Sequence, residues 1–305
     1  MDNMQYAMGW LKDMPDFRDF TPETDRVSSH LQAEGKADTV KEMLATANVK
    51  PAKAPKLPAK ADLRAWCSPI EHQKSIGSCT AHAGVGLIEY FERRAFGKHM
   101  DASRLFLYKV TRNLLKWTGD TGAYLRSTMG AMAMFGVAPE NYYPYVISRY
   151  DEEPSPFVYA MAQNFKAITF YRLDAVGTSK AQVLTNLKTQ LAAGLPAMFG
   201  FTCYTSLYHT NTPKTGEIPF PEKTESVTGG HAVMAVGYDD AKVIAHPLAP
   251  RQKTKGAILI RNSWGQEWGE QGYGWLPYEY LSGGIAEDFW CLIKKEYMET
   301  GQFNK

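Results

Sequence analysis

The chain has 305 residues, and its 34 Lys and Arg nearly balance 32 Asp and Glu, which leaves a formal net charge of +2 at pH 7. Hydrophobic residues make up 44% of the chain, a composition that excludes a disordered tail, a collagen-like chain and a coiled-coil rod. The balanced charge argues against nucleic acid as a partner. No apolar stretch approaches the roughly 20 residues that span a bilayer, and the start, MDNMQYAMGW, shows no signal-peptide pattern.

The beginning of the chain differs in composition from the rest. Residues 1–28 carry aromatic rings among acidic residues and prolines, which predicts an irregular segment that docks through its aromatics. Residues 29–48 have a partial apolar stripe that predicts a modest helix. Residues 50–60, KPAKAPKLPAK, combine three prolines with four lysines and predict an exposed, extended linker. We therefore expect a propeptide-like segment with its linker over residues 1–60 and one main domain over residues 61–305.

Within the main domain, helical patterns come first and strand patterns later. The apolar spacing predicts helices over residues 79–96, 103–117, 123–135 and 178–193. Short runs rich in β-branched and aromatic residues predict strands over residues 165–173, 195–201, 231–240 and 255–265. This order indicates an α+β fold with two lobes, mainly helical over about residues 61–165 and mainly β over about residues 166–293.

A cysteine at the start of a predicted helix is the first candidate for chemistry. Cys79 follows the small pair Gly77-Ser78 and opens the helix over residues 79–96. The free N–H groups and the dipole of a helix N-terminus stabilise a thiolate, which is the nucleophilic form of cysteine. Small residues before it allow a substrate backbone to approach the sulfur.

A histidine and an asparagine on two later strands complete the candidate set. His231 begins an apolar strand directly after Gly229 and Gly230, and Asn262 ends the strand that follows. If these strands pair antiparallel, the start of one lies beside the end of the other, so the two side chains come together. The amide oxygen of Asn262 can then accept a hydrogen bond from an imidazole N–H and hold the ring in orientation.

The strings GSC, GGHAV..VGY and RNSWG..WG..GYG, in this order and with Gln73 six residues before Cys79, resemble the papain-like cysteine peptidases. The resemblance covers roughly residues 61–293, and the early start of the domain is similar to bacterial-type members with a short N-terminal propeptide. Two positions depart from the family pattern: Ile76 replaces the usual cysteine, and Thr80 replaces the aromatic after the nucleophile. The resemblance implies a helical left lobe, a β-barrel-like right lobe and an active-site cleft between them.

The resemblance also implies a mechanism of peptide-bond hydrolysis, that of a cysteine endopeptidase. Cys79 is expected to attack the peptide carbonyl and form an acyl-enzyme, with His231 as proton carrier and Asn262 as its orienting partner. Gln73 and the backbone N–H of Cys79 are expected to form the oxyanion hole, and Trp264 to cover the Asn262–His231 hydrogen bond. No cofactor and no metal site are expected.

Residues that contact the substrate are predicted on both sides of the cleft. A polypeptide substrate is expected to lie extended and to pair with the backbone at Asp120, Thr121 and Gly122. The pocket beside it is expected to be lined by three small residues, Gly229, Gly230 and Ala286. Beyond the resemblance, Cys67, Cys203 and Cys291 are interpreted as structural, and with Cys79 catalytic at most one disulfide can form among them.

Family members are commonly made as zymogens, so residues 1–60 are expected to act as an inhibitor of the cleft that is removed by a cut within residues 50–60. A segment that stays uncut and permanently docked is the competing hypothesis. The family suggests a secreted or lysosome-like or vacuole-like location. Two further readings of the chain stay open at this point: a catalytically silent binding module of the same fold, and a Cys-His-Asn amidase acting on non-peptide amides.

Overall fold

The computed structural model describes residues 6–33, 35–47, 49, 57–165, 169–209 and 211–303 of the chain. The helices run, in chain order, over α1 Ser29–Ala33, α2 Val40–Thr46, α3 Cys79–Phe96, α4 Arg104–Leu115, α5 Leu125–Phe135, α6 Pro156–Ala162, α7 Lys180–Ala192, α8 Thr212–Thr215, α9 Tyr278–Ser282 and α10 Lys295–Met298. The strands run over β1 Trp10–Leu11, β2 Lys60–Asp62, β3 Ala123–Tyr124, β4 Thr169–Arg172, β5 Ala197–Tyr204, β6 Val227–Ala245, β7 Lys253–Arg261, β8 Tyr273–Pro277 and β9 Ala286–Ile293.

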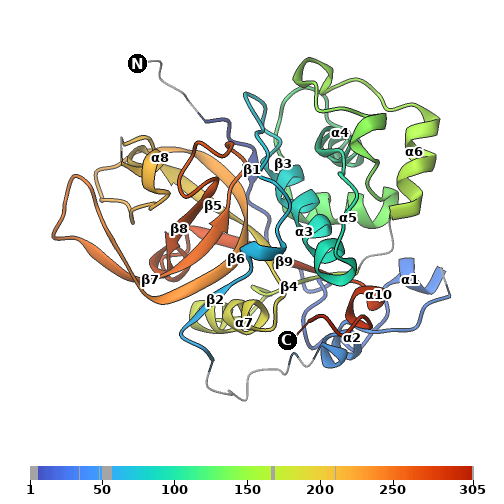
Figure 1. Cartoon of the computed structure of the whole chain (residues 1–305), viewed down its shortest axis with the longest axis horizontal. Helices are drawn as coiled ribbons and strands as arrows, with labels where there is room; N and C mark the ends of the chain where they lie inside the picture. The colour runs from blue at the N-terminus through green and yellow to red at the C-terminus, as the bar shows by residue number, and fades with distance from the viewer. Residues whose placement is uncertain are drawn as a thin grey trace.

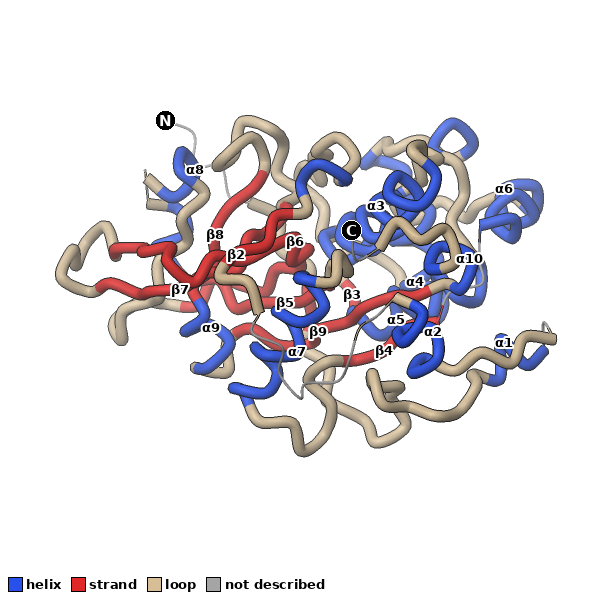
Figure 2. Tube along the Cα trace, turned by 60° about the horizontal axis from the view of Figure 1, so that its bottom comes forward, coloured by secondary structure: helices blue, strands red, loops and turns tan. Residues whose placement is uncertain are grey.

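Most strands belong to one antiparallel sheet with the order β4-β9-β5-β6-β7-β8, and β2 pairs with a further part of β6. Strands β4 and β8 lie at its edges, so the described strands form an open, strongly bent layer and not a closed barrel. Figures 1 and 2 show the helices α3 to α6 gathered on one side of the molecule and most of the sheet on the other. This arrangement confirms the predicted α+β, two-lobed architecture.

Helix α3 forms the contact between the two sides. It packs against β6 of the sheet and against α4 and α5, and its side chains from Cys79 to Phe91 are buried. A close approach to the sheet requires Gly86, because an added Cβ there would overlap with the guanidinium of Arg261 and the sulfur of Met234. The helix ends at Gly97, whose φ of 73° gives the left-handed conformation that commonly closes a helix.

The predicted helices and strands of the main domain are confirmed with small shifts of their ends. Helices α3, α4 and α7 cover the ranges expected near residues 79, 103 and 178, whereas the first two residues of the range 123–135 form β3 instead. The pattern did not predict β8 and β9, which carry much of the sheet. The division of the chain at residue 60 stays a prediction, and residues 50–56 of the predicted linker lie outside the described residues.

The single helix predicted over residues 29–48 is wrong, because the structure has two short helices, α1 and α2, in this range. Gly35, with a φ of 72°, lies between them in a conformation that does not continue a helix. Thr39 then starts α2 with a capping box, in which its hydroxyl accepts from the N–H of Glu42 and the Glu42 carboxylate accepts from the N–H of Thr39.

Helix α2 is part of the hydrophobic core. Its side chains Val40, Met43 and Leu44 are buried, and the helix packs against α10 and the strands β4 and β9 (Figure 1). Apolar burial therefore fixes this part of the segment to the region of the molecule that carries α10, β4 and β9. Among the described residues, no helix is both long and apolar enough to cross a membrane.

The substitution Leu44→Ala should lower the free energy of unfolding by about 2–4 kcal/mol, because it removes a buried side chain and leaves a cavity. Urea unfolding followed by tryptophan fluorescence measures the effect. Lys41→Ala on the exposed side of the same helix is the control, and we expect it to change stability by less than about 0.5 kcal/mol. Equal stability of the two variants would contradict a core role of α2.

Candidate active site

Cys79 lies at the first position of α3, fully buried, at the boundary between the helices and the sheet. Backbone N–H groups of Ala232, Gly9 and Thr80 face its sulfur. The N–H of Ala232 comes from the residue next to His231 on β6, so the structure brings the predicted cysteine and histidine to the same place. In the turn before Cys79, the N–H of Gly77 donates to the Asp120 carboxylate over 2.8 Å, and this hydrogen bond fixes the turn.

The antiparallel pairing predicted for the two strands is present. Strand β6 pairs with β7 in a register that sets Met234 opposite Arg261, and the nitrogen Nε2 of His231 lies 2.8 Å from Oδ1 of Asn262. The N–H of Ser263 donates to the same Oδ1, which identifies this atom as the amide oxygen. An oxygen acceptor requires Nε2 to carry the proton, so Nδ1 is the basic nitrogen of the neutral ring.

Trp264 stacks on the imidazole of His231, with ring centroids 4.3 Å apart and an interplanar angle of 19°. On its other side Trp264 stacks on Tyr6, at 4.2 Å. The indole therefore covers the histidine ring and is itself covered by a residue from the start of the chain. Next to Tyr6 the cleft opens into a cavity of about 510 Å³ between Trp264, Trp268 and Lys74.

Gln73 is fully buried next to the turn that carries Cys79. Its amide oxygen accepts from the hydroxyl of Ser263 over 2.6 Å, so its amide nitrogen faces the opposite way and donates to the carbonyl oxygens of Ile76 and Ala7, each over 3.1 Å. The carbonyl of Ala7 thus occupies the place where the sequence predicts that a substrate oxyanion binds. Ala7 therefore contacts the predicted oxyanion donor directly.

A series of hydrogen bonds from the helical side also holds Gln73 in position. The hydroxyl of Tyr145 donates to the carbonyl of Gln73 over 2.9 Å and is 2.6 Å from the hydroxyl of Ser78. Nδ1 of His82, one turn after Cys79, lies 3.1 Å from the Ser78 carbonyl. Burial lowers the pKa of His82 to about 3, so its ring is neutral and acts here as a hydrogen-bonding group.

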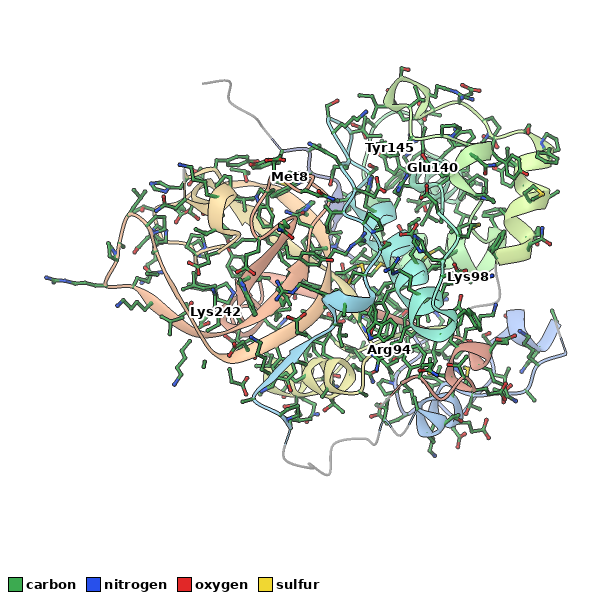
Figure 3. All side chains as sticks on the ribbon, viewed as in Figure 1. Met8, Arg94, Lys98, Glu140, Tyr145 and Lys242 are labelled. Atoms are coloured by element: carbon green, nitrogen blue, oxygen red, sulfur yellow. The ribbon has the colours of Figure 1, made fainter. Side chains whose placement is uncertain are left out.

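Residues 6–11 fill the cleft between the sheet and the helices, and Figure 3 shows Met8 at this boundary, with Tyr145 on the helical side. Gly9 is paired on both sides: its N–H donates to the carbonyl of Gly230 over 3.1 Å, and its carbonyl accepts from Ala123 over 2.8 Å. The following strand β1 runs parallel to β3. Only glycine fits at position 9, because an added Cβ would overlap with the carbonyl of Gly77.

The three residues predicted to pair with substrate on the helical side lie at this edge of the cleft. Gly122 is in van der Waals contact range of Gly9, and an added Cβ would overlap with the Gly9 carbonyl. Thr121 bonds within its own turn, and Asp120 accepts from Gly77 and from the hydroxyl of Tyr108. Asp120 therefore fixes the turn before Cys79. The backbone hydrogen bond to the cleft segment comes from the next residue after Gly122, Ala123.

The residues predicted beside the pocket lie on the sheet. Gly229 faces the side chain of Met8, and Gly230 pairs with Gly9 and faces the indole of Trp10. Ala286 is buried at the start of β9 opposite Phe201. Their roles in substrate binding stay predictions, but Gly229 and Gly230 both contact the segment that occupies the cleft.

Burial sets the protonation of the two reactive groups. It raises the pKa of the Cys79 thiol to about 12, and the N–H groups that face the sulfur offset this only in part. It lowers the pKa of His231 to about 4, against the opposite effect of the hydrogen bond to Asn262. At pH 7 the occupied cleft therefore holds a neutral thiol and a neutral imidazole, and the reactive ion pair is absent.

The sequence did not identify several residues that build this site. Gly9 and Tyr145 lie outside the sequence strings that predict the site, and Trp10 is one of several aromatic residues among the acidic residues of the segment 1–28. Within the described residues, no group of three or more His, Cys, Asp or Glu side chains could hold a metal ion, and the four cysteines are buried and free.

Comparison with known proteins gives matches over most of the chain. A sequence profile described as Papain family cysteine protease matches residues 57–293. The crystal structure of xylellain, a cysteine protease from Xylella fastidiosa, has 31% identity and a TM-score of 0.69, covering 95% of this chain and 96% of that chain. An uncharacterized peptidase C1-like protein of Acanthamoeba polyphaga mimivirus is 30% identical over 93% of this chain and 86% of its own length. Cathepsin K of Gallus gallus is 28% identical over 71% of this chain, and the match spans 58% of the cathepsin.

Iodoacetamide should modify Cys79 of the full chain slowly at pH 7 and faster as the pH rises, because the raised pKa keeps the fraction of reactive thiolate small at pH 7 and this fraction grows with pH. In Gly9→Ala, whose added Cβ displaces the cleft segment, modification at pH 7 should be faster by about tenfold or more. Peptide mapping by mass spectrometry measures both rates. Cys291, equally buried and remote from the cleft, is the internal control, and equal Cys79 rates in the two chains would argue against shielding by residues 6–11.

Proposed function

The chain belongs to the papain family of cysteine proteases, and we propose that it is an endopeptidase that hydrolyses peptide bonds through Cys79, His231 and Asn262. The observation that carries the proposal is the 2.8 Å hydrogen bond between His231 and Asn262, beside a thiol at the start of α3. A secreted or lysosome-like location stays a prediction from the family.

In the open cleft the reaction proceeds in two displacements. Removal of the cleft segment exposes Cys79 and His231 to water, which relieves the burial that keeps them neutral, and the thiol proton passes to Nδ1 of His231. The thiolate attacks the carbonyl carbon, the carbonyl oxygen becomes an oxyanion, and Gln73 donates to it. The C–N bond then breaks as His231 protonates the leaving amine, which leaves a thioester on Cys79.

Water completes the cycle. Nδ1 of His231 takes a proton from water as its oxygen attacks the thioester carbon, and the C–S bond breaks to release the carboxylic product and free Cys79. Asn262 acts throughout by holding Nε2, so that Nδ1 stays free as the basic nitrogen. The stacking of Trp264 excludes water from this hydrogen bond and strengthens it in a low-dielectric setting.

We further propose that the chain is made in an inhibited form, with residues 6–11 as the inhibitor. Their parallel pairing with β3 and the contact of the Ala7 carbonyl with Gln73 support occupation of the substrate's place. A cut within residues 50–60 would leave this segment bound through α2, whose side chains are in the core. Exposed positions nearer the cleft, at Met14 and Phe17, are better placed for an activating cut.

Variants made in the Gly9→Ala chain test the catalytic set. Cys79→Ala should abolish hydrolysis of a fluorogenic peptide, because no nucleophile remains. His231→Ala should lower kcat/KM by about 10²–10⁴-fold, the usual contribution of a positioned acid–base group. Asn262→Ala should cost less than His231→Ala, since packing by Trp264 retains part of the ring orientation.

Covalent labelling gives the control for these variants. An epoxysuccinyl thiol-protease inhibitor should form one adduct on Cys79 of the Gly9→Ala chain, read by intact mass and peptide mapping. No adduct in folded protein would favour a silent binding module. An adduct together with turnover of non-peptide amides alone would favour the amidase.

The inhibited form has its own test. Gly9→Ala in the full chain should raise peptidase activity by about 5- to 100-fold, because overpacking against Gly77 costs about 1–3 kcal/mol in the closed state only. Initial rates with a fluorogenic peptide measure the gain. The matched control is Gly130→Ala, a glycine of α5 with open space around its Cβ position, which should leave the rate unchanged. Full activity of the unmodified, uncut chain would contradict inhibition by residues 6–11.

A further inference from the structure

The indole of Trp10 occupies a pocket in the sheet side of the cleft. Trp10 is only 7% exposed, and the bottom of its pocket is Gly200 on β5, where an added Cβ would overlap with the indole ring. Gly230 on the neighbouring strand β6 also leaves room for Trp10, because an added Cβ there would overlap with the Trp10 carbonyl and the edge of its ring. Met198 and Thr202 share the face of position 200 on β5, and Gly200 between them has no side chain, so it leaves a gap in this face of the strand.

The end of the pocket is polar. Nε1 of Trp10 donates to Oδ2 of Asp288 over 3.1 Å, and Asp288 is fully buried on β9. The other oxygen of the same carboxylate accepts from Nη2 of Arg172 over 2.5 Å. Asp288 therefore presents a water-excluded acceptor that is held in place by a guanidinium, which Arg172 shares with Asp174 and Asp19.

The backbone around the pocket can bind other extended peptides in the same way. The contacts that hold the segment next to the pocket use the carbonyl of Gly230 and the N–H of Ala123, which recognise any peptide backbone. Side-chain selection therefore falls to the pocket at Gly200. A cavity that accepts an indole buries a large apolar area, on the order of 150–250 Å².

We propose that the pocket formed by Gly200, Gly230 and Asp288 selects substrates by a tryptophan side chain, and that Trp10 occupies in the closed chain the place of this substrate residue. The inference rests on the proposed peptidase function and adds its substrate class, polypeptides with tryptophan at one fixed position relative to the cleaved bond. Gly200 and Gly230 supply the room for the indole, and Asp288 supplies the acceptor for its N–H. Smaller side chains leave both the space and the acceptor unused.

The test uses the full chain carrying Gly9→Ala and Trp10→Ala, which frees the cleft and leaves every pocket residue in place. A position-scanning fluorogenic peptide library should show tryptophan preferred at a single position, with kcat/KM about tenfold or more above phenylalanine. At that position 2-naphthylalanine, similar in size but without the N–H, should be about tenfold poorer than tryptophan, because the buried acceptor Asp288 loses its partner.

Adding Gly200→Ala to this chain should abolish the tryptophan preference while peptides with alanine or valine at the same position are still cleaved. Adding Gly130→Ala instead is the matched control and should leave the profile unchanged. The naphthylalanine comparison needs no pocket variant, so it decides the question even if Gly200→Ala fails to fold.

Cleavage of the library with a preference for leucine or arginine, or with no preference, would overturn the tryptophan pocket and leave the peptidase in place. An unchanged tryptophan preference in Gly200→Ala would also overturn it. Absence of cleavage of every peptide, with no epoxysuccinyl adduct on Cys79, would overturn the proposed function and this inference together.

Discussion

The register between β6 and β7 is the constraint on which the site depends. It places His231 beside Asn262, and because side chains alternate along a strand, a shift by one residue would turn either side chain to the opposite face. The register is reinforced at Arg261, whose buried guanidinium donates to the hydroxyl of Ser68 and the carbonyl of Pro69. The same interaction fixes the stretch of chain that leads to Gln73, so the histidine and the oxyanion donor are positioned by one strand end.

The packing that aligns Cys79 and His231 also excludes water from them while the cleft is occupied. Burial raises the pKa of the thiol and lowers the pKa of the imidazole, and both shifts favour the neutral forms. Residues 6–11 produce this exclusion with few side chains, because the narrowest part of the cleft admits only the backbone of Gly9. The proposed inhibition would thus act through solvent exclusion as well as through occupation of the substrate's place.

The motif-bearing parts of the fold could be predicted from the sequence, because their signals are local. The range of α3, the antiparallel approach of His231 and Asn262 and the neighbourhood of Trp264 all follow from short strings with known geometry. The helix expected over residues 29–48 failed because Gly35 interrupts it.

The cleft occupant could not be predicted, because its contacts join residues far apart in the chain. Asp288 meets Trp10 across 278 positions, and neither residue lies in a motif. Composition suggested docking by aromatic side chains, and Trp10 does dock, whereas Phe17 is 87% exposed. Which aromatic docks depends on the gap at Gly200, a property of the folded sheet.

The N-terminal segment has two attachments of different kinds, and this decides how it can be released. Away from the cleft, α2 contributes apolar side chains to the core beside α10, β4 and β9. This attachment is lost only if that part of the core unfolds. On the cleft side, residues 6–11 are held by backbone hydrogen bonds and by the indole of Trp10, and ion pairs of Arg126 with Asp13 and Asp19 fix the stretch that follows. Opening of this part alone costs less than global unfolding, since it leaves the contacts of α2 and of the sheet in place. If residues 6–11 inhibit the enzyme as we propose, their release leaves α2 in the core, so the activating movement or cut falls in the stretch between them and not in the linker after α2.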